Sequence, residues 1–329
     1  MSYFDMPLDE LERYRPDVRP PVDFDRVWAE TLAAARSVPM QVQRSAATTR
    51  LRTVTVEDLR FPGFGGEPIA AWLVRPAAAA GVRLPIVVSY LGYGGGRGLP
   101  FEHLRWASAG YAELLMDTRG QGSTWGTGGD TPDPHGSAPA YPGSLTRGIG
   151  AFETHYYRRF FTDAVRAVDA ARSLGDVDPD QVVVAGSSQG GGTALAVGGL
   201  VDGLAAVIAG VPFLCHLRRA VAVSDSGPYA EIEKYLAVHR GQAEQVFHTL
   251  DYIDAMHHAS RASAPALFTA GLRDHTCPPS TVYAAFHAYG GPASMVTYEF
   301  NGHESGGAYQ DAAEIDFLQD VARVLPPTG

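Results

Sequence analysis

One serine in this chain stands where a catalytic nucleophile would be expected. The segment 186–190 (Gly-Ser-Ser-Gln-Gly) follows a short apolar, β-branched run and precedes small residues typical of a helix packed closely on a sheet. A chain that passes directly from strand to helix bends sharply at the residue between them, and glycines two residues away on either side leave room for the bend. Only Ser188 fits this register, because centring the pattern on Ser187 would put Ala185 and Gln189 at the glycine positions. The pattern predicts an exposed nucleophilic serine, with an ordinary glycine-rich turn as the alternative.

Asp274 and His303 lie where the partners of a serine nucleophile are needed. A serine hydroxyl is a weak nucleophile at neutral pH and requires a general base within hydrogen-bond reach. Each residue lies three positions after the end of a predicted strand, and functional side chains collect at the carboxyl ends of strands in an open α/β sheet. The chain order Ser188, Asp274, His303 is that of the α/β-hydrolase arrangement, in which the imidazole takes the serine proton and the carboxylate orients the imidazole. His275 competes with His303 as the base, but because it is adjacent to Asp274, alignment of the two side chains is difficult. The alternative role for Asp274 is a turn or helix cap, and the alternative for His303 is an ordinary solvated loop histidine.

The backbone donors of an oxyanion hole are expected on two loops. Gln189 directly follows the predicted nucleophile, and the glycine-rich run 91–96 follows a predicted strand. The α/β-hydrolase arrangement draws its N–H donors from these two places, and Tyr93 is the expected donor in the second because glycines surround it. The alternative, a phosphate-binding loop, is disfavoured because no G-K-[ST] follows and no G-x-G-x-x-G opens a helix.

Alternation of strands and helices from residue 85 onward predicts an α/β fold whose mostly parallel central sheet has helices on both faces. Ahead of it, residues 51–59 and 67–75 predict an antiparallel hairpin. The expected later strands are 85–91, 111–116, 181–187, 204–211, 264–271 and 294–300. The expected later helices are 151–174, 189–201, 278–289 and 307–325.

Two segments fall outside this alternation. Residues 1–45 carry apolar side chains at helical spacing and predict an N-terminal helical extension. Residues 212–262 have a helical pattern without a strand and predict a helical insertion over the carboxyl edge of the sheet, near the active site. We expect residues 1–329 to form a single α/β-hydrolase domain.

Composition narrows the expected partners and compartment. The 329 residues carry a formal net charge of −10 with acidic residues dispersed, which argues against nucleic acid or an anionic membrane as partner. Cys215 and Cys277 form no disulfide framework or metal-binding spacing. No apolar stretch reaches the roughly 18 residues of a membrane span, and residues 1–15 lack the apolar core of a signal peptide. We therefore expect a cytoplasmic protein that needs no metal or organic cofactor.

Three motifs occur in a fixed order along the chain: Arg-Gly-Gln at 119–121, Gly-x-Ser-Gln-Gly at 186–190 and His-Glu at 303–304. Together they resemble the acetyl xylan esterase and cephalosporin C deacetylase family of carbohydrate esterases. The resemblance extends from near the N-terminus to the last helix, because further stretches also match the family pattern. These stretches are 4–8, 146–149, 156–159, 212–216 and 277–281.

The resemblance implies a role for each of ten residues. It implies a catalytic triad, two oxyanion-hole donors, two supports of the site and three residues of a small acyl pocket. The triad residues are Ser188, Asp274 and His303, and the oxyanion donors are Tyr93 and Gln189. The supports of the site are Arg119 and Gln121. The acyl-pocket residues are Phe213, Pro228 and Cys277. An inert buried thiol is an equal alternative for Cys277.

The resemblance also implies a homo-hexamer whose active sites face an inner cavity, which favours small acetylated sugars over polymers. Two positions depart from the family pattern and bear on pocket polarity and substrate ranking. Leu91 stands where many members have histidine, and Ser187 stands where others have glycine.

We therefore expect a serine esterase that removes acetyl groups from sugar hydroxyls, such as those of xylo-oligosaccharides, and from cephalosporin C-type esters through an acetyl-Ser188 intermediate. The alternative enzyme is a broader carboxylesterase or peptidase of the α/β-hydrolase superfamily. The alternative from another class is a non-catalytic α/β-hydrolase scaffold that binds a ligand or partner.

Overall fold

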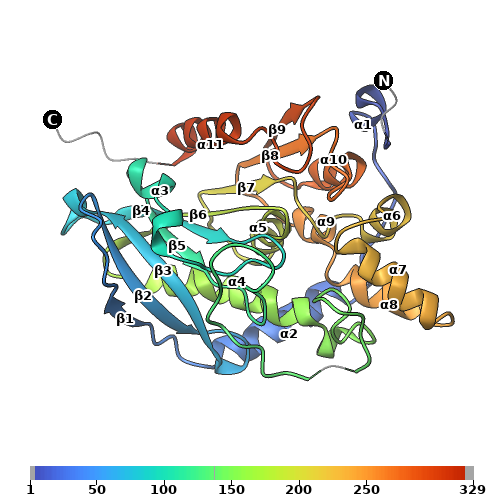
Figure 1. The fold of residues 1–329 in the computed structure, drawn as a ribbon, viewed down its shortest axis with the longest axis horizontal. Helices are drawn as coiled ribbons and strands as arrows, with labels where there is room; N and C mark the ends of the chain where they lie inside the picture. The colour runs from blue at the N-terminus through green and yellow to red at the C-terminus, as the bar shows by residue number, and fades with distance from the viewer. Residues whose placement is uncertain (1–3, 137, 323–329) are drawn as a thin grey trace.

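A computed structural model describes residues 4–136 and 138–322 (Figure 1). A nine-stranded sheet with the order β1-β2-β3-β5-β4-β6-β7-β8-β9 runs through it. Antiparallel pairing joins β1, β2, β3 and β5, and parallel pairing joins β5, β4 and β6 to β9. The predicted α/β class and the mostly parallel sheet are confirmed.

The strands include the predicted hairpin, β2 with β3, and all six predicted later strands. They are β1 (Gln43–Ala46), β2 (Val54–Pro62), β3 (Pro68–Pro76), β4 (Leu84–Tyr90), β5 (Ala112–Met116), β6 (Val177–Ser187), β7 (Ala206–Gly210), β8 (Ala266–Gly271) and β9 (Ala293–Tyr298). The α-helices are α1 (Leu8–Leu11), α2 (Phe24–Arg36), α3 (Arg105–Ser108), α4 (Tyr156–Ser173), α5 (Gln189–Leu200), α6 (Leu217–Val223), α7 (Tyr229–Val238), α8 (Ala243–Asp251), α9 (Ala255–Ala259), α10 (Pro279–Ala288) and α11 (Ala308–Val321).

The central strands are apolar on both sides because helices cover both faces of the sheet. Ile86 and Val88 of β4 belong to the large core that includes residues of α2, α4, α5, α9 and α10. Val87, between them, faces a smaller core with Trp106 of α3 and Leu318 of α11. Figure 1 shows α3 and α11 on one side of the sheet and α2 and α4 on the other. Since successive side chains of a strand point to opposite faces, both cores hold the same strand.

The N-terminal segment is less helical than its apolar spacing predicts. Between α1 and α2 the chain contains Pro16, Pro20 and Pro21, and it forms no helix there because proline removes a backbone donor and clashes with the preceding turn. Residues 43–46 form β1, an edge strand whose side chains are all exposed. Because an exposed edge strand has no buried face, its sequence lacks the alternation of apolar and polar residues from which a strand is predicted.

The segment 212–262 forms α6, α7, α8 and α9 and, over these described residues, no strand. Figure 1 shows α6, α7 and α8 beyond the carboxyl ends of the parallel strands, where the helical insertion is expected. Helix α9 instead packs against α5 and α10 on one face of the sheet.

Candidate active site

Ser188 occupies a sharp turn between β6 and α5. Its backbone has φ 58° and ψ −122°, outside the regions that a non-glycine residue ordinarily adopts. Its N–H donates to the Gly210 carbonyl at 2.9 Å, and its own carbonyl accepts from Phe213 N at 2.9 Å. A Cβ at Gly190 would lie 2.1 Å from the Tyr90 carbonyl oxygen, so this position requires glycine. The structure thus gives the segment the nucleophile-elbow geometry that its glycine spacing predicts.

Asp274 and His303 are in direct contact. His303 Nδ1 lies 2.9 Å from Asp274 Oδ2, and the carboxylate is fully buried. The second oxygen, Oδ1, accepts from the backbone N–H groups of Thr276 at 2.8 Å and Cys277 at 2.9 Å. These bonds fix the carboxylate, and the carboxylate in turn orients the imidazole and selects the tautomer with its proton on Nδ1. The competing base, His275, stacks on Phe4 with ring centroids 3.9 Å apart.

Ser188 and His303 line the same cavity, whose volume is about 570 Å³. No hydrogen bond joins Ser188 to His303 within the described ranges, and such contacts are often long before substrate binds. The cavity is lined by Tyr90, Leu91, Gly92, Tyr93, Trp125, Ser187, Ser188, Pro228, Thr276 and His303.

Asp274, Cys277 and His303 also form a cluster of potential metal ligands. One ligand atom from each lies within 4.8 Å of the other two. The Asp274 carboxylate already accepts three hydrogen bonds, from His303 and two backbone N–H groups. Burial also raises the pKa of the Cys277 thiol well above its ordinary value. A metal would need the thiolate and would displace bonds that the carboxylate already makes.

The two expected oxyanion donors are free to bind a ligand. Neither the Tyr93 N–H nor the Gln189 N–H donates a hydrogen bond to another residue of 4–136 or 138–322. Gln121 connects their loops: Oε1 accepts from Gly94 N at 2.5 Å, and Nε2 donates to Gln189 Oε1 at 3.0 Å. Gln189 Nε2 in turn donates to the Leu91 carbonyl at 3.2 Å. The side chains of the two glutamines therefore tie together the backbones that carry the two N–H groups.

Arg119 lies outside the cavity and joins three separate parts of the chain. Its guanidinium is fully buried and pairs bidentately with Asp163 of α4, with Nη2 and Oδ1 2.8 Å apart. Nη1 also lies 2.6 Å from Glu67 Oε2, in the β2–β3 hairpin, and 3.2 Å from Asp133 Oδ1. The Arg119 carbonyl accepts from the Tyr156 hydroxyl at 2.6 Å. Arg119 thus holds the backbone that leads to Gln121.

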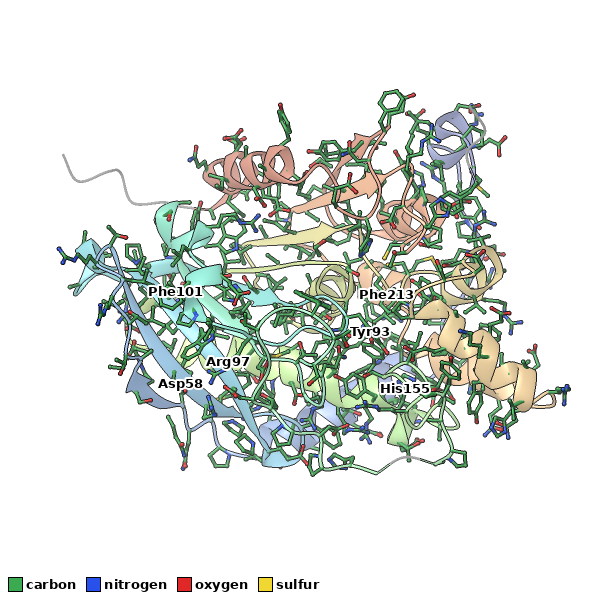
Figure 2. All side chains as sticks on the ribbon, viewed as in Figure 1. Asp58, Tyr93, Arg97, Phe101, His155 and Phe213 are labelled. Carbon is green, nitrogen blue, oxygen red and sulfur yellow. The ribbon has the colours of Figure 1, made fainter. Side chains whose placement is uncertain are left out.

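The three residues of the expected acyl pocket occupy different positions. Pro228 lines the cavity, whereas Phe213 and Cys277 are buried and do not line it. The Phe213 ring packs edge-on against Tyr93, with centroids 6.1 Å apart, and Figure 2 shows the two side chains close together. Phe213 therefore supports the wall of the cavity, while Cys277 Sγ lies within 4.8 Å of ligand atoms of Asp274 and His303.

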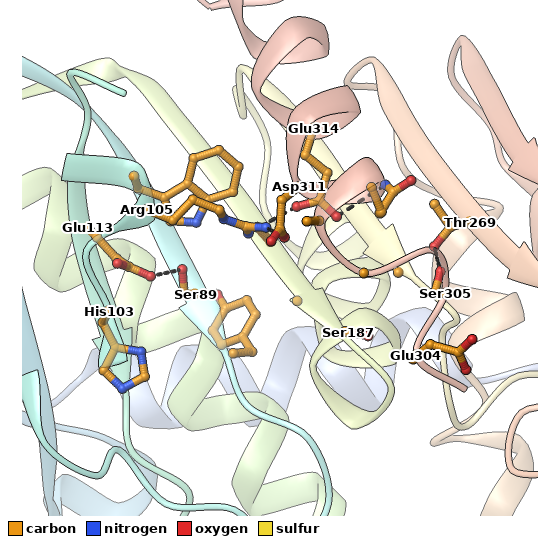
Figure 3. A pocket seen from close by; sticks show the side chains of 18 of the residues that line it. Ser89, His103, Arg105, Glu113, Ser187, Thr269, Glu304, Ser305, Asp311 and Glu314 are labelled. Carbon is orange, nitrogen blue, oxygen red and sulfur yellow. Dashed lines mark hydrogen bonds and ion pairs between the residues drawn. The ribbon is translucent and has the colours of Figure 1, made fainter. Parts of the chain in front are cut away.

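Ser187, the residue before Ser188, borders a second cavity of about 520 Å³. This cavity lies between α3, α11 and the carboxyl ends of the central strands (Figure 3). It meets the first cavity at Tyr90 and Ser187, which line both. Its buried wall contains Glu113, which accepts a hydrogen bond from Ser89 at 2.7 Å, and burial raises the pKa of Glu113 to about 7.

Three residues at the site carry no sequence signal that predicts them. Trp125 and Thr276 line the cavity, and Glu231 of α7 accepts a hydrogen bond from the Tyr93 hydroxyl at 2.5 Å. Each reaches the site through tertiary packing from a segment without a motif of its own.

Comparisons with known proteins place the chain in a family. A sequence model of the acetyl xylan esterase family matches residues 1–321. The solved acetyl xylan esterase from Paenibacillus sp. R4 superposes with a TM-score of 0.90 at 37% identity, over 96% of this chain and 100% of that one. Acetyl xylan esterase 1 from Thermoanaerobacterium sp. gives 0.88 and 30%, over 96% and 99%.

Two more distant matches support the family and the fold, respectively. Acetyl esterase Axe7A of Xylanibacter ruminicola is 27% identical over 301 residues, which is 89% of this chain and 65% of that relative's length. Acylaminoacyl peptidase of Pyrococcus horikoshii, at 16% identity and a TM-score of 0.62 over 85% of this chain and 44% of that one, shares the fold. The predicted α/β-hydrolase fold and the predicted family are confirmed: the chain belongs to the acetyl xylan esterase family.

Proposed function

We propose that the protein is a serine esterase that removes acetyl groups from the hydroxyls of sugars, with Ser188, His303 and Asp274 as its catalytic triad. The observation that carries this proposal is the 2.9 Å contact between His303 Nδ1 and Asp274 Oδ2, beside a strained Ser188 that lines the same cavity as the imidazole. Membership of the acetyl xylan esterase family supports the reaction class.

In the first half of the proposed reaction, Ser188 Oγ attacks the acetyl carbonyl carbon while His303 Nε2 accepts the serine proton. The carbonyl oxygen becomes an oxyanion, and the free N–H groups of Tyr93 and Gln189 stabilise it. The bond to the sugar oxygen then breaks, and His303 returns the proton to that oxygen. The sugar leaves with its hydroxyl restored, and the acetyl group remains on Ser188.

In the second half, a water molecule attacks the acetyl-Ser188 carbonyl while His303 accepts one of its protons. The second tetrahedral intermediate uses the same two N–H donors. Its collapse breaks the bond to Ser188 Oγ, which regains the proton from His303, and acetate is released. Throughout, Asp274 stabilises the charged imidazole without itself becoming protonated.

The proposed substrates are acetylated xylo-oligosaccharides and cephalosporin C-type acetyl esters. Two solved relatives that superpose closely are acetyl xylan esterases, which supports the first class, and the family resemblance supports the second. By that resemblance we further propose a homo-hexamer, which light scattering on the purified protein tests.

The experiment that tests the nucleophile is acetate release from acetylated xylo-oligosaccharides by the wild type, S188A and S45A. Ser45 lies on the exposed edge strand β1, so its replacement controls for loss of a serine. We expect S188A to lose at least about a thousandfold in kcat and S45A to retain wild-type turnover. Full activity in S188A would refute the nucleophile assignment.

An acyl-length series on p-nitrophenyl esters distinguishes the acetyl esterase from a broader carboxylesterase or peptidase. A small acyl pocket predicts a steep fall in kcat/KM beyond propionyl, whereas a flat profile would favour the broader enzyme. A non-catalytic scaffold would show no labelling of Ser188 by an organophosphate.

A further inference from the structure

Glu231 reaches from the helical segment beyond the sheet to the loop that carries the proposed oxyanion donor. It lies on α7, its side chain is buried, and both carboxylate oxygens have partners. Oε1 accepts from the Tyr93 hydroxyl at 2.5 Å, and Oε2 accepts from Leu145 N at 3.0 Å. Pro228, immediately before α7, lines the active-site cavity, so this helix touches the site at two points.

Tyr93 is held at both its side chain and its backbone. Its phenolic oxygen also accepts from Ser144 N, and its carbonyl accepts from Trp125 Nε1 at 2.7 Å. The next residue, Gly94, donates to Gln121. Among these contacts only the bond to Glu231 involves a carboxylate, and charge-assisted hydrogen bonds are roughly twice as strong as neutral ones. The Tyr93 N–H remains unused, which leaves it available to a ligand.

The loop at 143–145 is built closely around the same carboxylate. Gly143 has φ +134°, and a Cβ there would lie 2.2 Å from Glu231 Oε1. Burial raises the pKa of Glu231, while the hydrogen bond from Tyr93 and that from Leu145 lower it. A side chain that only filled space would need neither this close approach nor two directed bonds.

We propose that Glu231 is a positioning residue for catalysis: through the Tyr93 hydroxyl it fixes the Tyr93 backbone so that its N–H points at the developing oxyanion. This inference rests on the proposed function. An oxyanion donor stabilises a transition state only when it is already in place, and loss of one donor costs about 10²–10³ in kcat. The substitution Glu231→Gln loosens the Tyr93 N–H, so we expect it to lower kcat by part of that factor.

The test compares E231Q, which removes the charge and leaves one acceptor oxygen for the two donors Tyr93 Oη and Leu145 N, with Y93F, which removes the hydroxyl donor. E233Q is the matched control. Glu233 is exposed on the same helix, two residues away. Active sites are first titrated with a serine-directed phosphonate, and kcat and KM for p-nitrophenyl acetate are then expressed per titrated site. This normalisation removes any effect of a smaller folded fraction.

We expect kcat and kcat/KM of E231Q and Y93F to fall together by about 10- to 100-fold, the pattern of an interaction lost in the transition state. E233Q should match the wild type. The double variant should be no worse than the worse single variant, because both changes remove one interaction. If E231Q does not fold, the kcat per titrated site of Y93F, compared with that of the wild type, tests the proposal.

Wild-type kcat per titrated site in E231Q or Y93F would overturn the inference and leave Glu231 a structural tie. Losses that multiply in the double variant would overturn it as well, because the two residues would then act separately. Absence of phosphonate labelling at Ser188 in the wild type would instead refute the proposed function, and this outcome is seen before any variant is compared.

Discussion

At the scale of single residues, the site depends on carboxylates that are held in fixed environments. Asp274 is fully buried and bonded by two backbone N–H groups as well as by His303. Glu113 is also buried, but Ser89 is its only hydrogen-bond donor within the described part of the chain. Because burial raises the pKa of Glu113, its environment favours the neutral carboxyl group.

Replacing Asp274 with asparagine should preserve the packing and remove the tautomer that the mechanism needs. An asparagine amide can donate to Nδ1, which would leave the proton on the nitrogen that faces Ser188. We predict a fall in kcat of about ten-thousandfold at neutral pH, as in other serine triads. Steady-state acetate release measures it, and D202N, at an exposed position, is the control. A loss under tenfold would contradict the assigned role of Asp274.

Glu113 should make stability depend on pH. Because burial raises its pKa from 4.5 to about 7, the folded state holds the proton more tightly than the unfolded state does. The resulting stabilisation is complete below about pH 4 and is lost as pH rises through about 7. The shift corresponds to about 3 kcal/mol, so the free energy of unfolding of the wild type should fall relative to E113Q between pH 5 and pH 8. Urea denaturation at both pH values tests this, and an unchanged difference would contradict it.

At the scale of elements, the strand–turn–helix at β6 and α5 is the most constrained part of the site. We predict that G190A destabilises the protein by several kcal/mol and greatly lowers activity, because the new Cβ would lie 2.1 Å from the Tyr90 carbonyl oxygen. Gly241 has no heavy atom within 4 Å of the corresponding position. G241A is therefore the control and should be near neutral in chemical denaturation. Equal effects of the two substitutions would contradict this account of the turn.

The elements that the sequence predicts are those whose signal is local. The glycine spacing around Ser188 is complete within five residues, and the apolar strands beside it are recognised from their own composition. Strand β1 is exposed along its whole length, and the Tyr93–Glu231 contact joins residues 138 positions apart. Strand β1 shows no alternation of apolar residues in the sequence, because it has no buried face. The Tyr93–Glu231 contact shows no sequence pattern either, because it depends on how α7 packs.

At the scale of the whole molecule, one buried arginine connects the hairpin, helix α4 and the loops near the site. Arg119 contacts Glu67, Asp133 and Asp163, and its removal would leave Asp163 buried without its cation. We predict that R119M lowers the free energy of unfolding by about 3–5 kcal/mol. R119M/D163N should recover part of the loss, since the uncompensated charge is then gone.

Thermal and urea denaturation measure both variants. R19M is the control, because Arg19 and its partner Asp17 are almost fully exposed and such pairs contribute about 0–1 kcal/mol. A loss in R119M no larger than in R19M would show that the buried cluster does not hold these segments together.

No helix in the ranges 4–136 and 138–322 is long and apolar enough to cross a membrane. The proposed catalytic residues instead come from three distant parts of the chain, which the carboxyl ends of β6, β8 and β9 bring to one edge of the sheet. The central claim is that Ser188 carries the acetyl group during turnover.

Rapid-quench mass spectrometry during hydrolysis of p-nitrophenyl acetate tests that claim most directly. We expect one acetyl group on the peptide that contains Ser188 in the wild type within the first turnover, and none on the same peptide of S188A. Turnover without acetylation of Ser188, or acetylation of a different residue at the rate of turnover, would contradict it.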